Sequence, residues 1–265
     1  MIQWNGTMKD KAFKILLLLA VISILLVPVG ILFSLIIKSI PAFQHFSFIV
    51  SGEWFSFIGY SLLVSVLALI IAAPFSISLL LIYSEYRKKK KIASTLAFIM
   101  DLFAYIPSIV WGIWAYYNLH LIYDRLGIEH HSFGILPVSI VMALMMIPYS
   151  VSVCIHYIPF VPRKIKEGAY CLGATRLEII GTIGFPFMAK GLIATGLLSL
   201  AKALGETMVV VILFGKTVTS VILNRFGTIN DLEFGTLFLL ALFLFLVTAA
   251  VNIAARYMFG RFWYE

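Results

Sequence analysis

The chain has 265 residues, of which 62% are hydrophobic and only 12% are charged, and its formal net charge is +8. A soluble domain carries about a quarter charged residues and about half apolar ones, so this excess of apolar residues predicts an integral membrane protein. The same composition excludes intrinsic disorder and a disulfide scaffold. Two cysteines, Cys154 and Cys171, make no metal site alone, and we expect neither a metal nor a cofactor.

Six apolar runs are long enough to cross a bilayer, which takes about 20 residues per helix. The first, Ile15–Ile37, contains no charge, is too long for a signal-peptide core and precedes no small-residue cleavage site. The others are 60–83, 102–121, 135–158, 188–215 and 234–255. The third apolar run begins at Ile92 and is longer than the hydrocarbon thickness requires, so we expect its part up to Asp101 to lie along the cytoplasmic interface.

Lysine and arginine residues alternate between the two sides of these runs. Fourteen of them precede the first run, follow the second and fourth runs or lie in the tail, whereas the opposite loops hold four. Because positive loops stay in the cytoplasm, both termini are predicted to be cytoplasmic, which agrees with an even number of spans. Short basic clusters between apolar runs set membrane orientation, so we expect no nucleic-acid partner.

The longest cytoplasmic loop, residues 159–187, contains a motif with regular spacing. It resembles the loop of ABC-importer permeases that reads E-A-A, three residues, G, nine residues, I-x-L-P. The matching residues are Glu167, Ala169, Gly173, Ile183 and Pro186, whereas Gly168 replaces the usual alanine and Phe185 the usual leucine. In the permeases that it resembles, this loop docks in a groove of the ATP-hydrolysing subunit, where Glu167 would make a charged contact. The alternative is a solvated connecting loop.

The residue types in this loop also predict its local structure. Pro162 suits the start of a helix over 163–172, and Gly173 then allows a turn with positive φ. A second helix is expected over 175–183, and Pro186 marks the return to the membrane. The loop is therefore predicted to form a helix–turn–helix outside the bilayer.

Two opposite charges interrupt the fifth run. Lys202 and Glu206 are four residues apart, so on a continuous helix they share one face. An intramembrane charge costs several kcal/mol and marks a functional site by default. Either the pair neutralises itself and fixes helix packing, or it faces a water-filled path together with Thr207. We favour the path, where the lysine attracts an oxyanion and the glutamate accepts a hydrogen bond from a protonated phosphate oxygen, which ionised sulfate lacks.

A stripe of small residues runs beside these charges. Small side chains at every fourth position let a neighbouring helix approach closely, or they line a path, and both interpretations stay open. The residues are Gly191, Thr195, Ser199, Ala203 and Thr207.

Three further segments resemble the PstC-type phosphate permease family. They are A-L-G-E-T-M at 203–208, S-E-Y at 84–86 and I-P-S-I-V-W-G at 106–112, and with the loop the resemblance covers 52–215. That family usually has arginine where Lys202 stands, and lysine offers a point charge instead of a bidentate fork. Sulfate and molybdate permeases carry a related A-L-G-E, so a permease for another oxyanion is the alternative.

The resemblance implies an all-α, type I ABC importer permease fold with six transmembrane helices in the cell (inner) membrane. Its five-helix core would occupy 57–256, with an additional first helix at 15–37 and cytoplasmic segments at 1–14 and 257–265. The implied partners are a second permease subunit of PstA type, a dimer of ATPase subunits, an external phosphate-binding protein and phosphate itself. The chain lacks a Walker-type glycine-rich loop of the form G-x-x-x-x-G-K-[ST], so ATP hydrolysis is expected in the ATPase partner.

An intramembrane enzyme is the rival interpretation from another class, and we disfavour it. His130 and His131 lack the H-E-x-x-H spacing of a zinc site, and no second aspartate shares the helix of Asp101. We therefore expect no catalytic residue.

Overall fold

The computed structural model describes residues 8–44, 54–86, 90–127, 133–157, 161–225 and 231–263, and all regular secondary structure in these ranges is helical. The predicted all-α class is confirmed. Five helices are long: α1 (Met8–Gln44), α3 (Trp54–Tyr86), α6 (Ile135–Tyr157), α9 (Phe185–Leu204) and α12 (Asp231–Trp263). The shorter elements are α4 (Lys90–Ala104), α5 (Ser108–Leu126), α7 (Arg163–Cys171), α8 (Arg176–Glu178), the π-helical turn η1 (Ile179–Gly184), α10 (Met208–Leu213) and α11 (Val218–Arg225).

Some sequence predictions fall outside the described residues. They concern residues 1–7, the basic residues Arg87–Lys89, the histidines His130 and His131, and residues 158–160 at the start of the long loop.

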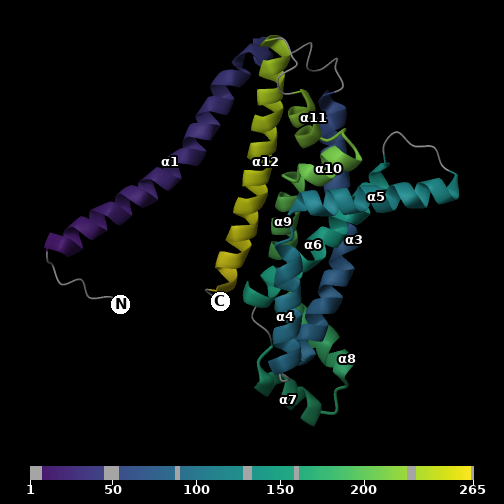
Figure 1. The fold of residues 1–265 in the computed structure, drawn as a ribbon. Coiled ribbons are helices and arrows are strands. Elements are labelled where there is room, and N and C mark those ends of the chain that lie inside the picture. The colour runs from purple at the N-terminus through teal and green to yellow at the C-terminus, as the bar shows by residue number, and fades with distance from the viewer. Residues whose placement is uncertain are drawn as a thin grey trace.

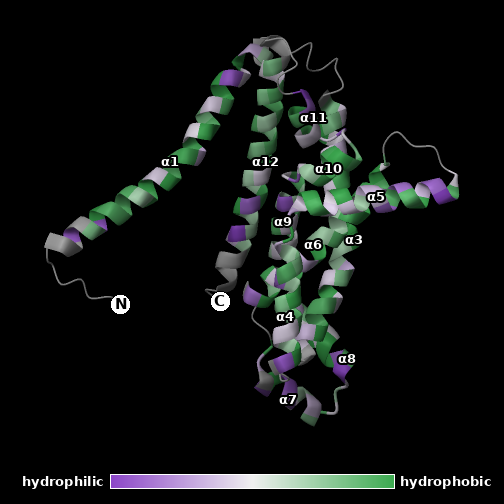
Figure 2. Ribbon diagram, viewed as in Figure 1, coloured by the Kyte–Doolittle hydropathy of each residue, from purple (hydrophilic) through white to green (hydrophobic). Residues whose placement is uncertain are grey.

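The core of the bundle is formed by α3, α6 and α9, with α4 against α6 and α12 against α9 (Figure 1). Small residues of α3, such as Ala68 and Ala72, pack with the fully buried Met142 and Met146 of α6. The long helices consist mostly of hydrophobic residues, whereas hydrophilic residues gather at α7 and α8 (Figure 2). The long helices also expose large apolar side chains, such as Phe33 and Ile70. Helix α1 leans away from the bundle and packs mainly on α12 (Figure 1).

Within the described ranges, four helices are each long and apolar enough to cross a membrane, or up to six if each of two bent helix pairs is one span. The prediction of six spans agrees with the larger of these two numbers, in which each bent pair counts as one span. The N-terminal end of α1 and the C-terminal end of α12 point toward the end of the bundle that carries α7 and α8, and α11 lies at the opposite end (Figure 1).

The third apolar run is broken, so the predicted single helix over 102–121 does not form. Helices α4 and α5 meet at 83°, because Pro107 adopts an extended ψ of 136° and disfavours helix at the residue before it. Helix α4 runs alongside α6, and α5 crosses the bundle over α10 (Figure 1). The segment predicted to lie along the cytoplasmic interface packs against the long helix α6.

Gly112, the last residue of the I-P-S-I-V-W-G segment, lies at the crossing of α5 and α10. A Cβ atom at this position would lie 2.9 Å from Ile212 Cδ1 and 3.4 Å from the Cα of Val209. The glycine therefore lets the two backbones approach closely.

The fifth apolar run is also broken, so a continuous helix over 188–215 is wrong. Helix α9 ends at Leu204 with Gly205 as its C-cap, and α10 starts only at Met208. Glycine weakens a helix by about 1 kcal/mol relative to alanine. In addition, the side chain of Glu206 bonds the N–H groups of Thr207 and Met208 and starts a new helix there.

Candidate substrate path and coupling loop

Lys202 lies in the last turn of α9, half-buried against α6. Its Nζ is 4.1 Å from the centroid of the Tyr149 ring, a cation–π contact that stabilises the ammonium group without neutralising it. Glu206 follows the end of the helix, so the prediction that both charges share one helical face is wrong. Both side chains are described, and they do not form an ion pair with each other. Glu206 still acts electrostatically on Lys202, so both interpretations of the two charges stay open.

Glu206 caps the start of α10. Its Oε1 accepts hydrogen bonds from the N–H groups of Thr207 at 3.1 Å and Met208 at 3.2 Å, where a negative charge is favourable. Its backbone carbonyl accepts a bond of 2.8 Å from the hydroxyl of Thr219. Carboxylate oxygen Oε2 takes part in none of these bonds. One residue therefore holds the break in place and keeps a carboxylate oxygen for another donor.

Hydroxyl-bearing residues contribute to a small hollow at Glu206. They are Ser61, Ser65, Thr217 and Thr219, and apolar residues such as Val64 and Leu204 complete the lining. The hollow is braced, because Ser61 Oγ accepts a 2.8 Å bond from the N–H of Val218 and ties α11 to α3. Sequence reasoning missed these residues, although the run T-V-T-S after Gly215 offered a signal for a polar lining.

Most of the small-residue stripe packs against neighbouring helices. Gly191, Thr195, Ser199 and Ala203 are buried, and Ser199 Oγ lies 2.7 Å from Ser150 Oγ on α6. Thr207 lies apart in the break, where its hydroxyl donates to the Gly205 carbonyl at 3.3 Å. The packing interpretation is confirmed for the four residues on α9.

The long loop forms the predicted helix–turn–helix. Helix α7 starts directly after Pro162, and Gly173 has a φ of +85°. Ile183 lies in η1, so the second helix continues beyond α8 as a π-helical turn, and Pro186 is in the first turn of α9. At Gly168 a Cβ atom would meet nothing within 4 Å, so the usual alanine would fit.

A capping box holds the second helix of the loop. The Glu178 carboxylate accepts 2.7 Å and 2.8 Å bonds from the N–H and the hydroxyl of Thr175, and the Glu178 N–H donates back to that hydroxyl. The backbone bond from Thr175, followed by its hydroxyl bond, lowers the pKa of Glu178 below its ordinary value of 4.5.

The tip of the loop exposes two leucines that sequence reasoning missed. Leu172 is 90% exposed and Leu177 is 81% exposed, beside the exposed Glu167 and Gly173 and the half-buried Ala169. At the base of the loop, Lys166 Nζ donates to Ser84 Oγ at 3.3 Å and joins α7 to the end of α3. The S-E-Y segment therefore lies at the same end of the bundle as the loop.

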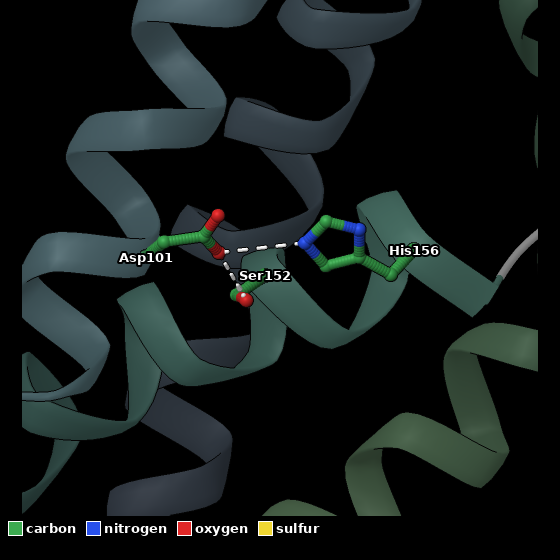
Figure 3. Close-up of polar contacts among 3 residues, drawn as sticks. All are labelled: Asp101, Ser152 and His156. Atoms are coloured by element: carbon green, nitrogen blue, oxygen red, sulfur yellow. Dashed lines mark hydrogen bonds and ion pairs between the residues drawn. The ribbon is translucent and has the colours of Figure 1, made fainter.

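Asp101, Ser152 and His156 gather where α4 packs on α6 (Figure 3). The carboxylate Oδ1 of Asp101 accepts a 2.6 Å bond from Ser152 Oγ and lies 3.6 Å from His156 Nε2. In a serine hydrolase the histidine lies between the serine and the acid. Here the carboxylate lies between the other two, so no base activates the serine. Within the described ranges no three His, Cys, Asp or Glu residues gather to hold a metal ion.

Residues 77–264 match the family described as the binding-protein-dependent transport system inner membrane component. The chain belongs to this family of multi-pass membrane permeases, so it is a transporter subunit and not an enzyme. Membership implies a partner ATPase, a substrate-binding protein and a second permease subunit.

The relatives define the branch of the family. The chain is 28% identical over 302 residues to the phosphate transport system permease protein PstC of Haemophilus influenzae, covering 97% of this chain and 95% of that one. It is 30% identical over 237 residues to PstC of Pasteurella multocida, covering 76% and 72%.

Solved structures of related architecture confirm the fold. An inward-facing structure of the MetNI methionine ABC transporter gives a TM-score of 0.60 at 15% identity, covering 83% of this chain and 98% of that one. A crystal structure of an amino acid ABC transporter gives 0.57 at 16% identity, covering 78% and 92%. The predicted ABC importer permease fold is confirmed.

Proposed function

We propose that the chain is a permease subunit of an ATP-driven phosphate importer, where it forms half of the translocation path with a PstA-type subunit. The observation that carries this function is the half-buried Lys202 beside the Glu206 break, in a chain similar to PstC proteins over nearly its whole length. The α7–α8 end and both termini face the cytoplasm in this proposal, and α11 faces the external phosphate-binding protein. The basic residues of α7 support this orientation.

Lys202 and Glu206 recognise different features of phosphate. The ammonium group of Lys202 attracts the anionic oxygens, and its contact with the Tyr149 ring leaves its charge unneutralised. Glu206 Oε2 accepts a hydrogen bond from a protonated oxygen of phosphate. Fully ionised sulfate has no such proton, so its oxygens would meet an unbalanced carboxylate. Thr207 lies in the same break and completes this part of the path.

The loop couples the permease to the ATPase dimer. Leucines as exposed as Leu172 and Leu177 are unfavourable in water, and burying each in a groove of the ATPase would contribute about 1.5–3 kcal/mol. Glu167 adds a charged contact beside them. Gly173 turns the chain, and Ile183 and Pro186 connect the loop to α9, so motion of the ATPase reaches the helix that carries Lys202.

The test is uptake of radioactive phosphate and sulfate into vesicles that contain both permease subunits and the ATPase, with the binding protein added outside. We expect ATP-dependent uptake of phosphate and little uptake of sulfate. Preferred uptake of sulfate or molybdate would replace this function by the second candidate, a permease for another oxyanion, which the shared A-L-G-E segment supports.

A further inference from the structure

A second polar cavity lies at the α11 end of the bundle, outside the path described above. Its volume is about 450 Å³, and its lining includes the cationic Lys216 and Arg225 and the polar Ser56, Tyr60 and Asn224. Among the described residues that line it, none is acidic. The described lining therefore carries two cationic side chains, at the end of the bundle that faces outward in the proposed orientation.

The fold holds this cavity in shape. Gly215, with a φ of +71°, turns the chain after α10 and brings Lys216 into the lining. The bond from the Val218 N–H to Ser61 then fixes α11 on α3. Apolar residues form the floor, where Phe57 packs with Val221 and its ring lies 5.9 Å from Arg225 Cζ.

We propose that this cavity is an additional binding site for a tetrahedral oxyanion such as phosphate, which the ion occupies before it reaches Lys202. The inference rests on the proposed function. The lysine, arginine, amide and hydroxyl groups supply many hydrogen-bond donors for such an ion. Cavities of about 300–1,000 Å³ hold whole drug-sized ligands, so a small anion would keep several waters here and bind weakly. Weak binding suits a site that must release its ion onward.

The position of the cavity supports the order of the two sites. Tyr60 and Lys216 line the cavity, and their chain neighbours Ser61 and Thr217 line the hollow of Glu206. The cavity and the hollow of Glu206 therefore adjoin each other along α3 and the turn between α10 and α11. An ion that leaves the cavity inward would pass Ser61 and Thr217 on its way to the carboxylate and Lys202.

The experiment uses the complete transporter in proteoliposomes and compares the wild type with Lys216→Ala/Arg225→Ala. We expect uptake at low phosphate concentration to fall about tenfold, as when a cleft no longer concentrates its ion electrostatically. Uptake at saturating phosphate should change less than twofold. Because salt screens the attraction between the anion and these two cations, the difference in uptake between the variant and the wild type should shrink at about 1 M salt.

Two controls separate this effect from misfolding and from general charge loss. Lys216→Arg/Arg225→Lys keeps both charges and should retain nearly wild-type uptake. Lys38→Ala removes a cation from the C-terminal part of α1, where Lys38 Nζ lies 5.0 Å from the centroid of the Phe238 ring. Lys38 does not line the cavity, so this change should leave uptake unchanged. An equal loss in Lys38→Ala, or wild-type uptake in the double alanine variant, would overturn the proposal.

A phosphate group can also come from a lipid headgroup, and two binding measurements distinguish the sources. The first is broadening of the ³¹P resonance of inorganic phosphate by the purified transporter, and the second is native mass spectrometry of retained phospholipid. Loss of either signal in the double alanine variant supports a phosphate-group site, and the first identifies the free ion. If wild-type vesicles import sulfate instead, only the proposed substrate fails, and a salt-sensitive loss of sulfate uptake would still support the site.

Discussion

The coupling loop and the break after α9 lie at the two ends of one continuous segment and present their side chains in opposite ways. The loop exposes Leu172 and Leu177, whereas the break half-buries Lys202 and Glu206 against α6, α10 and α11. Exposed apolar groups suit a protein partner, and buried charges suit an ion. The difference shows that α9 joins a surface that binds a subunit to an interior that binds a substrate.

The strongest test of this comparison removes the buried charges. Lys202→Ala or Glu206→Ala should lower uptake at least about a hundredfold, because each removes a half-buried charged group that would contact the ion, with the complex still assembled. Glu206→Gln keeps an oxygen for the N–H groups of Thr207 and Met208 but has no charge. The measurement is phosphate uptake beside the yield of purified complex.

Lys202→Arg keeps the positive charge and should keep substantial uptake. Wild-type uptake in both alanine variants would end the substrate-path hypothesis. Wild-type uptake in Glu206→Gln would limit that residue to capping α10.

The next test acts on the loop alone. Leu172→Asp should weaken binding of the ATPase about tenfold or more, because the buried leucine contributes about 1.5–3 kcal/mol. Glu167→Lys should uncouple ATP hydrolysis from uptake. Copurification of the ATPase measures its binding, and the rate of ATP hydrolysis beside uptake measures the coupling. Cys171→Ser changes another exposed residue of the same loop and is the matched control. Undisturbed docking and transport in both variants would remove the coupling role.

A smaller effect is expected at the crossing of α5 and α10. Gly112→Ala places a Cβ atom against Ile212 and the Val209 backbone and should cost about 1–3 kcal/mol by overpacking. Thermal unfolding of the purified complex measures it. Gly196→Ala on α9 meets nothing within 4 Å and is the control. If both changes have equal effects, the close approach does not matter.

The smallest effect concerns the pH response of the loop. The pKa of Glu178 is lowered in the folded loop, so its contribution to stability is full above the ordinary value of 4.5 and is lost as the pH falls through the lower value. Amide-exchange protection of residues 176–178 should therefore stay constant from neutral pH to about 5 and fall below it. Glu178→Gln should reduce protection already at neutral pH. Equal protection in the variant and the wild type would show that the carboxylate does not stabilise the loop.

The loop could be predicted from the sequence because its structure is local. Pro162, Gly173 and the matched motif lie within a few residues of the elements that they determine. The break after α9 could not be predicted in the same way, because Gly205 lies inside a long apolar run that favours a continuous helix. The contacts that hold the break come from elsewhere, such as the hydroxyl of Thr219 on the Glu206 carbonyl and the Tyr149 ring on Lys202.

The same reason explains the remaining differences. The bend at Pro107 had a local signal, but the crossing of α5 over α10 depends on tertiary packing at Gly112. The sequence alone does not distinguish Leu172 and Leu177 from buried leucines. Their exposure in the structure is what indicates a surface for a partner subunit. Local chemistry thus indicates where a helix starts or ends, whereas tertiary contacts decide which charges face inward.

The π-helical turn at Ile179–Gly184 fixes the rotational setting of α9 relative to the loop. Each residue turns an α-helix by about 100°, so inserting or deleting a single residue here would swing the Ser199 hydroxyl away from Ser150. Point substitutions leave that setting unchanged. Insertions and deletions are therefore the mutations that residues 179–184 tolerate least.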